Sequence, residues 1–171
     1  IEVLLLSDRV DAWLLSHLPE YEGKKFTSVT QGDLDLGKLD SDEDKKEQEK
    51  QETEFASFIE RVKTVLGDKV KDVRITHRLT STPSCIVADN DDMSTQMAKL
   101  MEQMGQPVPE SKPIFEVNPE HVMITKLADM ADEELFAQWS ELLLEQAILS
   151  EKGSLDDPSE FVGRINKLLL G

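Results

Sequence analysis

Positive charge, cysteine and aromatic side chains are all scarce in this chain of 171 residues. Its 19 Lys and Arg residues stand against 35 Asp and Glu residues, which gives a formal net charge of -16. Nucleic acids and anionic lipid surfaces are bound through clustered Lys and Arg, so we expect neither kind of partner and no membrane association. The single cysteine, Cys85, cannot form an internal disulfide, and no secretory signal is visible. These features predict a cytoplasmic protein.

The sequence also lacks the motifs that carry chemistry. His17, His77 and His121 lie far apart, with neither the His-x-x-x-His nor the Cys-x-x-Cys spacing of a metal site. Cys85 has no local signature of an activated nucleophile and is interpreted as a buried or half-buried thiol. The eight glycines are scattered and form no phosphate-binding loop. We therefore expect no catalytic residue, no metal and no bound cofactor in this chain, which we do not expect to be an enzyme.

A hydrophobic content of 39% and a charged content of 32% are typical of a globular protein. The chain opens in an apolar run at Ile1 without an initiator Met, which suggests a piece of a longer protein. Val3 to Leu6 predict a strand, Asp8 predicts the cap of a helix, and 25–30 predict a second strand. We expect residues 1–37 to be the end of a preceding domain, and 38–171 to be a domain of their own.

The middle of the chain predicts a mixture of helices and strands. Residues 31–54 are acidic and lead into a solvated helix, whose apolar positions begin at Phe55 and end at Leu66, before Gly67. Alternation over 73–79, followed by an apolar run at 85–87, predicts a hairpin-like pair of strands. Further elements are expected as a third strand at 114–117 and a helix capped by Asn118 with Pro119 at its first position.

Two amphipathic helices are expected at the end of the chain. The first begins near Asp132 and ends at Gly153, and the second begins at Asp157-Pro158. Their apolar stripes are too wide for both to be covered by this chain, so a second copy would complete a four-helix bundle. The alternative is that the hairpin fits against the helix at 55–66. The expected fold class is α+β: a small mixed sheet with helices and this hairpin, preceded by a small α/β piece. The candidate dimer-interface residues are Trp139, Leu142, Leu143, Leu149, Ile165, Leu168 and Leu169.

Methionine is concentrated in one segment. An amphipathic helix, capped by Asp92 and ended by Gly105, would place its apolar residues on one face. That face could pack on the hairpin strands as ordinary core. Unbranched thioethers also suit a surface that must adapt to many apolar partners, which favours an exposed docking helix for unfolded or partly folded client proteins. The residues of this face are Met93, Met97, Leu100, Met101 and Met104.

Several stretches in one order resemble a known family. They include Val-Leu-Leu-Leu-Ser-Asp-Arg-Val-Asp-Ala-Trp-Leu-Leu from Val3, Val-Lys-Asp-Val-Arg-Ile-Thr-His-Arg-Leu from Val70, and Phe-Glu-Val-Asn-Pro-Glu-His from Phe115. Met-Ser-Thr-Gln-Met-Ala-Lys-Leu from Met93 and Asp-Asp-Pro-Ser-Glu-Phe from Asp156 extend the match over nearly the whole chain. The sequence resembles the ninety-kilodalton heat-shock chaperones, most closely their bacterial members.

This resemblance implies an ATP-driven dimeric chaperone, of which the chain holds the end of the middle domain and the C-terminal dimerisation domain. ATP and Mg²⁺ would be bound by an N-terminal domain outside this sequence. The family places client contacts at Trp13 and on the methionine helix. The last residues, Leu168 to Gly171, lack the motif that recruits tetratricopeptide co-chaperones in eukaryotic relatives, so that partner is not expected. A purely structural dimerisation scaffold without client contact is the alternative function.

Overall fold

In a computed structural model, the structure describes residues 3–8, 10–27, 42–89, 92, 98, 100–101, 103–107 and 111–170, with only the backbone for residues 12, 16 and 42–48. The chain divides into two compact units. The first comprises 1–33 and 88–111, and the second comprises 34–87 and 112–171. These compact units do not test the expected boundary between functional domains at residue 37, which stays a prediction.

The first unit contains one short helix and one small hairpin. Helix α1 (Asp11–His17) follows a turn in which Asp8 Oδ1 accepts the Val10 amide at 3.1 Å and Asp11 Oδ2 accepts the Asp8 amide at 2.7 Å, while its N-cap residue, Val10, makes no side-chain cap. The predicted helix after Asp8 is thus confirmed. The strand predicted at 3–6 is wrong: these residues have no strand assignment, and no ladder partner for them occurs in the described part of the chain.

The small hairpin pairs β1 (Glu20–Tyr21) with β2 (Lys24–Lys25) in antiparallel register. Its two-residue turn places Glu22 at φ 50 and Gly23 at φ 76, the positive values that a tight turn matching the strand twist requires. The sequence predicted a strand at 25–30, but of its described residues only Lys25 lies in a strand, and 26–27 do not. Residues 28–30 lie outside the described residues.

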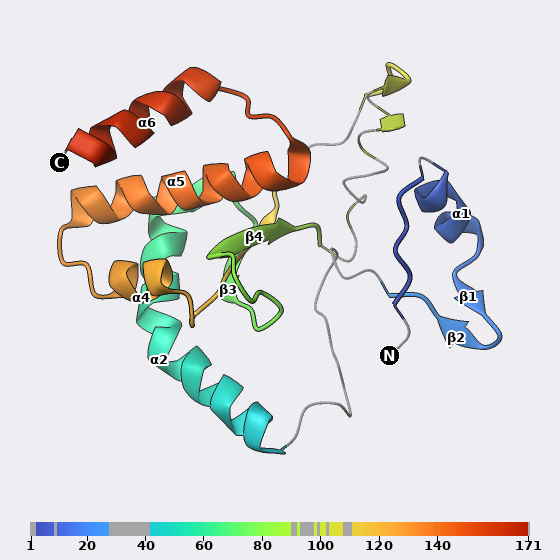
Figure 1. Cartoon of the computed structure of the whole chain (residues 1–171), viewed down its shortest axis with the longest axis horizontal. Coiled ribbons are helices and arrows are strands. Elements are labelled where there is room, and N and C mark those ends of the chain that lie inside the picture. Colours follow the sequence, from blue (N-terminus) through green and yellow to red (C-terminus); the bar gives the residue numbers. More distant parts are fainter. Residues whose placement is uncertain are drawn as a thin grey trace. The chain divides into compact units, whose positions relative to one another are not determined.

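A three-stranded sheet forms the centre of the second unit (Figure 1). Its order is β3-β5-β4, comprising β3 (Asp72–Ile75), β5 (Ile114–Val117) and β4 (Ser84–Val87). β5 lies parallel to β3 and antiparallel to β4. The strand at 114–117 is confirmed, but the predicted direct pairing of β3 with β4 is wrong. All four residues of β5 are buried, and a strand of that kind takes the central position with a neighbour on each side.

The β3–β4 connection is tied to the residue that follows β5. Asn118 is buried, and its Nδ2 donates to the carbonyls of Leu79 at 3.2 Å and Thr82 at 3.3 Å. Asn118 Oδ1 accepts the Glu120 amide at 3.0 Å, but the helix does not begin there, so the prediction that Asn118 caps the next helix is wrong. Helix α4 (Val122–Ala128) begins later, and His121 Nδ1 accepts the Met123 amide as its cap at 3.2 Å.

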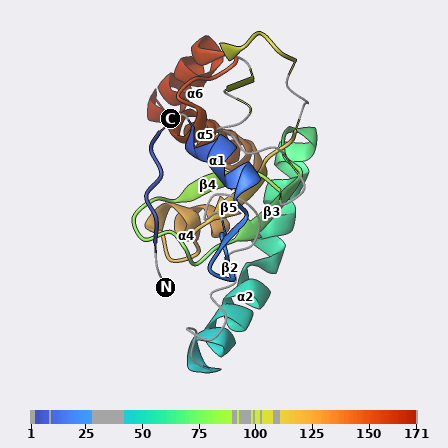
Figure 2. The ribbon, with the colours of Figure 1, turned by 90° about the vertical axis from the view of Figure 1, so that its right-hand side faces the viewer.

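Helix α2 (Asp42–Leu66) docks by its second half, as the sequence predicts. Phe58, Val62 and Leu66 are buried, whereas residues 49–54 are exposed except for the half-buried Gln51. Gly67 follows at φ 49 in the expected left-handed conformation and opens a short 3-10 turn, η2 (Gly67–Lys69). The first half of α2 projects beyond the sheet in both views (Figures 1 and 2).

Two further helices complete the second unit, and each begins at an aspartate cap. Asp132 Oδ1 accepts the Leu135 amide at the start of α5 (Glu133–Lys152), which ends at Gly153 with φ 81. Asp157 Oδ1 accepts the Glu160 amide at the start of α6 (Pro158–Leu170). α5 covers β4 and packs against α2, and α6 lies along α5 (Figure 1). The core between these elements includes Phe58, Val62, Val73, Phe115, Val117, Ile124, Leu127, Phe136, Leu143 and Leu144.

The described residues thus confirm the expected α+β class with a small mixed sheet and a terminal helical hairpin. Among them, no helix is both long enough and apolar enough to cross a membrane.

Candidate functional site

The hairpin of α5 and α6 contains the predicted interface residues, and its two helices are covered very differently. α5 buries six side chains, among them Leu142 and Leu143, while α6 buries none. Trp139 is half-buried and packs against the core, and Leu149 is 38% exposed. The alternative prediction was that the hairpin packs against the helix at 55–66. Of the two helices of the hairpin, α5 packs on α2 in this way and α6 does not.

Helix α6 has an outward apolar face that nothing in the described unit covers. Val162 is 53% exposed, Leu169 79% and Leu170 87%. Ile165 and Leu168 are half-buried. Val162, Ile165 and Leu169 follow one another at helical spacing, so they form one stripe along the helix. Of the predicted interface residues, Leu169 is the one most available to a partner.

One arginine fastens α6 to α5. The Arg164 side chain is 10% exposed, and its Nε donates to Glu145 Oε2 at 3.0 Å. Its guanidinium also pairs with Glu141 and, within α6, with Glu160. Burial acts to lower the pKa of Arg164, but the hydrogen bonds and charges of the surrounding carboxylates raise it above its usual value. The Glu160 carboxylate, three residues after the Asp157 cap, is turned to Arg164.

The predicted client-contact residues belong to the first unit. The Trp13 ring on α1 is exposed and lies 4.4 Å from the His17 ring, centroid to centroid. Met104 is 64% exposed, whereas Leu100 and Met101 are half-buried. The helical segment that carries Leu100 and Met101 ends at Gly105, as predicted. Gly105 takes φ 70, and the Gln106 amide donates to the Met101 carbonyl at 2.9 Å. Met93 and Met97 lie outside the described residues.

The sheet contains a buried polar cluster that the sequence did not predict. Glu116 on β5 is 1% exposed and accepts from Arg74 Nε at 2.9 Å and from Arg78 Nη2 at 2.6 Å. The Cys85 thiol lies 3.6 Å from its other oxygen. A carboxylate inside the apolar run Ile-Phe-Glu-Val was the available signal, because a buried charge needs partners on neighbouring strands.

The same cluster bears on the reactivity of Cys85. Burial, followed by the negative charge of Glu116, raises the pKa of the thiol to about 12. A thiol with so high a pKa is protonated at neutral pH and is a poor nucleophile, which agrees with the interpretation from the sequence. Among the residues whose placement is described, no group of three or more His, Cys, Asp or Glu side chains could hold a metal ion.

Comparison with known proteins defines the family of the chain. The model of the family described as Hsp90 protein matches residues 1–171, and the chain belongs to that family. It is 92% identical over 170 residues to the Chaperone protein HtpG of Psychromonas ingrahamii, an alignment that covers 99% of this chain and 27% of that protein. It is 61% identical to the Chaperone protein HtpG of Pseudoalteromonas translucida and 59% identical to that of Shewanella pealeana, with the same coverage. The chain thus spans about a quarter of the length of the curated relatives it matches.

Proposed function

We propose that the chain is the C-terminal dimerisation and client-contact part of an Hsp90-type, ATP-dependent chaperone that assists protein folding in the heat-shock response. The supporting observation is that Val162 and Leu169 on α6 are exposed, beside an α5 that buries six side chains. A helix with an apolar stripe and no buried residue is stable when another surface covers that stripe. A second copy is the simplest cover, and two hairpins would form a four-helix bundle.

Membership in the family supports the remaining roles that we propose. The parent protein would bind ATP and Mg²⁺ in a domain outside this sequence, and this chain would hydrolyse no ATP. Residues 1–37 would be the end of the middle domain, and 38–171 would be the dimerisation domain. The partners would be a second copy and unfolded or partly folded clients in the cytoplasm.

Sedimentation equilibrium over a range of concentrations tests the dimer. The double substitution Val162→Asp with Leu169→Asp places two charges on the exposed stripe without disturbing the core, and should convert a dimer into a monomer. Val122→Asp is the matched control, because Val122 is 59% exposed on α4 and lies outside the hairpin. A wild-type chain that is monomeric at every concentration, or a double variant that still dimerises, would show that α6 is not the interface.

Client contact is supported by the exposed apolar side chains of Trp13 and Met104 in the first unit. Replacing Trp13 with Ala and Met104 with Ser should weaken capture of a reduced, carboxymethylated unfolded protein while the far-ultraviolet spectrum stays unchanged. Tyr21→Ser is a suitable control, because Tyr21 is equally exposed, at 61%. Unaltered capture would favour the alternative function, a dimerisation scaffold that touches no client.

A further inference from the structure

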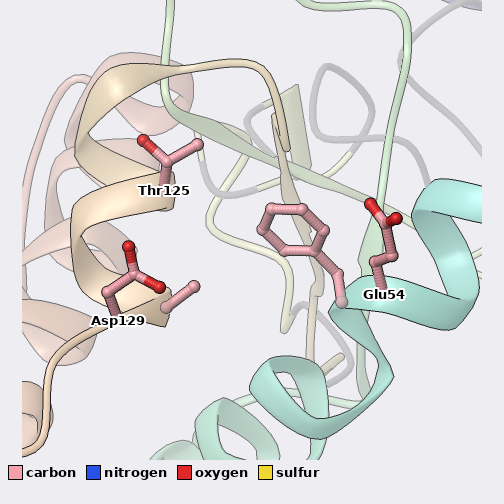
Figure 3. Close-up of a pocket in the computed structure, with 5 residues that line it drawn as sticks. Glu54, Thr125 and Asp129 are labelled. Carbon is pink, nitrogen blue, oxygen red and sulfur yellow. The ribbon is translucent and has the colours of Figure 1, made fainter.

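A cleft between α2 and α4 lies apart from the hairpin and has no part in the proposed dimer. It has a volume of about 310 Å³ and is lined by Glu54 and Phe55 from α2 and by Thr125, Ala128 and Asp129 from α4. Glu54 stands on one wall, and Thr125 and Asp129 stand on the opposite wall (Figure 3). The two walls therefore present a carboxylate each, with apolar surface between them.

Both walls are held in place by the core. Phe55 is half-buried and packs edge-on against the buried Phe58, with 5.9 Å between ring centroids. On the other wall, Arg61 donates to the carbonyls of Ala128 at 3.4 Å and Met130 at 2.8 Å, which anchors the end of α4. The cleft is thus preformed, so a ligand would bind without a large cost of ordering these walls.

The carboxylates of the cleft have little internal compensation. Glu54 pairs with Lys50 at 3.7 Å, but both side chains are more than half exposed, and such pairs are weak. No ion pair to Asp129 occurs in the part of the chain that the structure describes. Asp129 is moreover the C-cap of α4, where the helix dipole disfavours a negative charge. The charge of Asp129 therefore does not stabilise α4.

The lining of the cleft is complementary to a cation. Its aromatic surface and its two carboxylates together suit a planar cation with several N–H donors.

We propose that this cleft binds an arginine side chain presented by a basic, partly apolar segment of a partner protein. The guanidinium would lie against the Phe55 ring and donate to Glu54 and Asp129, and apolar neighbours in the segment would contact Ala128 and the Thr125 methyl group. The formal charge of -16 favours a basic partner and opposes a second copy of this acidic chain in the same place. The inference goes beyond the proposed function, because dimerisation uses α6.

The test uses the whole 171-residue chain and a short fluorescent peptide, Gly-Ser-Leu-Arg-Leu-Ser-Gly, whose binding is followed by anisotropy at low salt. Citrulline in place of the arginine gives a peptide of the same shape without the charge, and it should bind measurably less. Asp129→Asn and Glu54→Gln should each weaken binding of the arginine peptide by about two- to fivefold, as expected for a partly exposed ion pair. Glu52→Gln is the matched control, because Glu52 is an exposed acid on α2 that does not line the cleft.

Each alternative occupant predicts a different result. No binding of the arginine peptide, or equal weakening by Glu52→Gln, would overturn the proposal in favour of diffuse attraction to an acidic surface. Equal binding of the citrulline peptide would show that the cleft does not select a cation. If Asp129→Asn instead changed self-association in the absence of peptide, the cleft would be a contact between copies, and the proposal would be wrong. Phe55→Leu keeps the apolar contact and should weaken the arginine peptide more than the citrulline peptide.

Discussion

Helices α5 and α6 have similar sequence patterns but are buried to different extents. Each begins at an aspartate cap and carries an apolar stripe, yet α5 buries six side chains and α6 buries none. α5 is placed against both β4 and α2, whereas α6 lies along α5. An amphipathic stripe therefore shows that a helix needs cover on one side, but the position of the helix in the fold decides whether the same chain supplies it.

The sharpest test of this comparison is a pair of equal truncations. Leu143→Ala removes a side chain that is 1% exposed in the core and should lower the free energy of unfolding by about 2–5 kcal/mol. Leu169→Ala removes one that is 79% exposed and should cost less than about 0.5 kcal/mol at concentrations where the chain is monomeric. Urea denaturation measures both values. Similar losses for the two variants would mean that α6 is packed within its own chain after all.

The coupling between the two helices should depend on Arg164. Arg164→Met leaves Glu141 and Glu145, each about one-fifth exposed, without their shared cation, and should cost about 1–2 kcal/mol. Arg164→Lys keeps the charge without the planar fork and should lose less. Hydrogen exchange should accelerate in α6 and remain slow in α5. Faster exchange in both helices would contradict the expectation that only α6 depends on Arg164.

The attachment of α5 to the core can be tested through Arg61. Its guanidinium carbon lies 3.9 Å above the centre of the Phe136 ring, and its Nη2 donates to the Met130 carbonyl. Arg61→Met should cost about 1 kcal/mol, because these contacts join α2 to the start of α5. Lys126→Met, at an exposed position on α4, controls for the loss of one charge. Equal thermal stability of the two variants would mean that Arg61 stabilises the fold no more than the exposed Lys126 does.

The smallest effect is expected at the edge of the sheet. Asp72 pairs with Lys63 at 2.8 Å. Although burial acts to raise the pKa of Asp72, the hydrogen bonds from Lys63 and the Val73 amide lower it below its usual value. A lowered pKa in the folded state means that this carboxylate stabilises the fold above its unfolded pKa of about 4, and that the contribution is lost as the pH falls through the folded value. Both side chains are more than a third exposed, so the pair should contribute less than about 1 kcal/mol.

Asp72→Asn should therefore reduce stability slightly at pH 7, and the difference from wild type should disappear in acid. Denaturation of both proteins across that range gives the comparison. A difference that grew as the pH fell would mean that folding does not lower the pKa of Asp72.

Local signals in the sequence identified most helix ends correctly. Gly67, Gly105 and Gly153 have the positive φ values expected of helix ends, and Asp157 caps the helix that it precedes. These predictions succeeded because a cap depends on residues within one turn of one another. The strand at 114–117 was equally visible as a short apolar run.

Long-range features were missed for a corresponding reason. The pairing of β3 and β4 through β5 depends on residues that are up to about forty positions apart, and neither strand indicates its partner. Asn118 was assigned as a cap from its neighbours, yet the helix begins only after His121, and the Asn118 Nδ2 group donates to carbonyls of a distant connection. The cleft at Glu54 and Asp129 could not be foreseen either, because its walls belong to different helices.

The sequence by itself determined the family, the α+β class, the caps and the apolar stripes of the terminal helices, since all of these depend on residue identity and local spacing. Only the tertiary structure decided that α5 is enclosed while α6 keeps an open stripe, that Glu116 has two arginine partners, and that two acids meet across one cleft. Burial and charge pairing arise between segments distant in the chain, and their free energy depends on where the folded backbone brings them together.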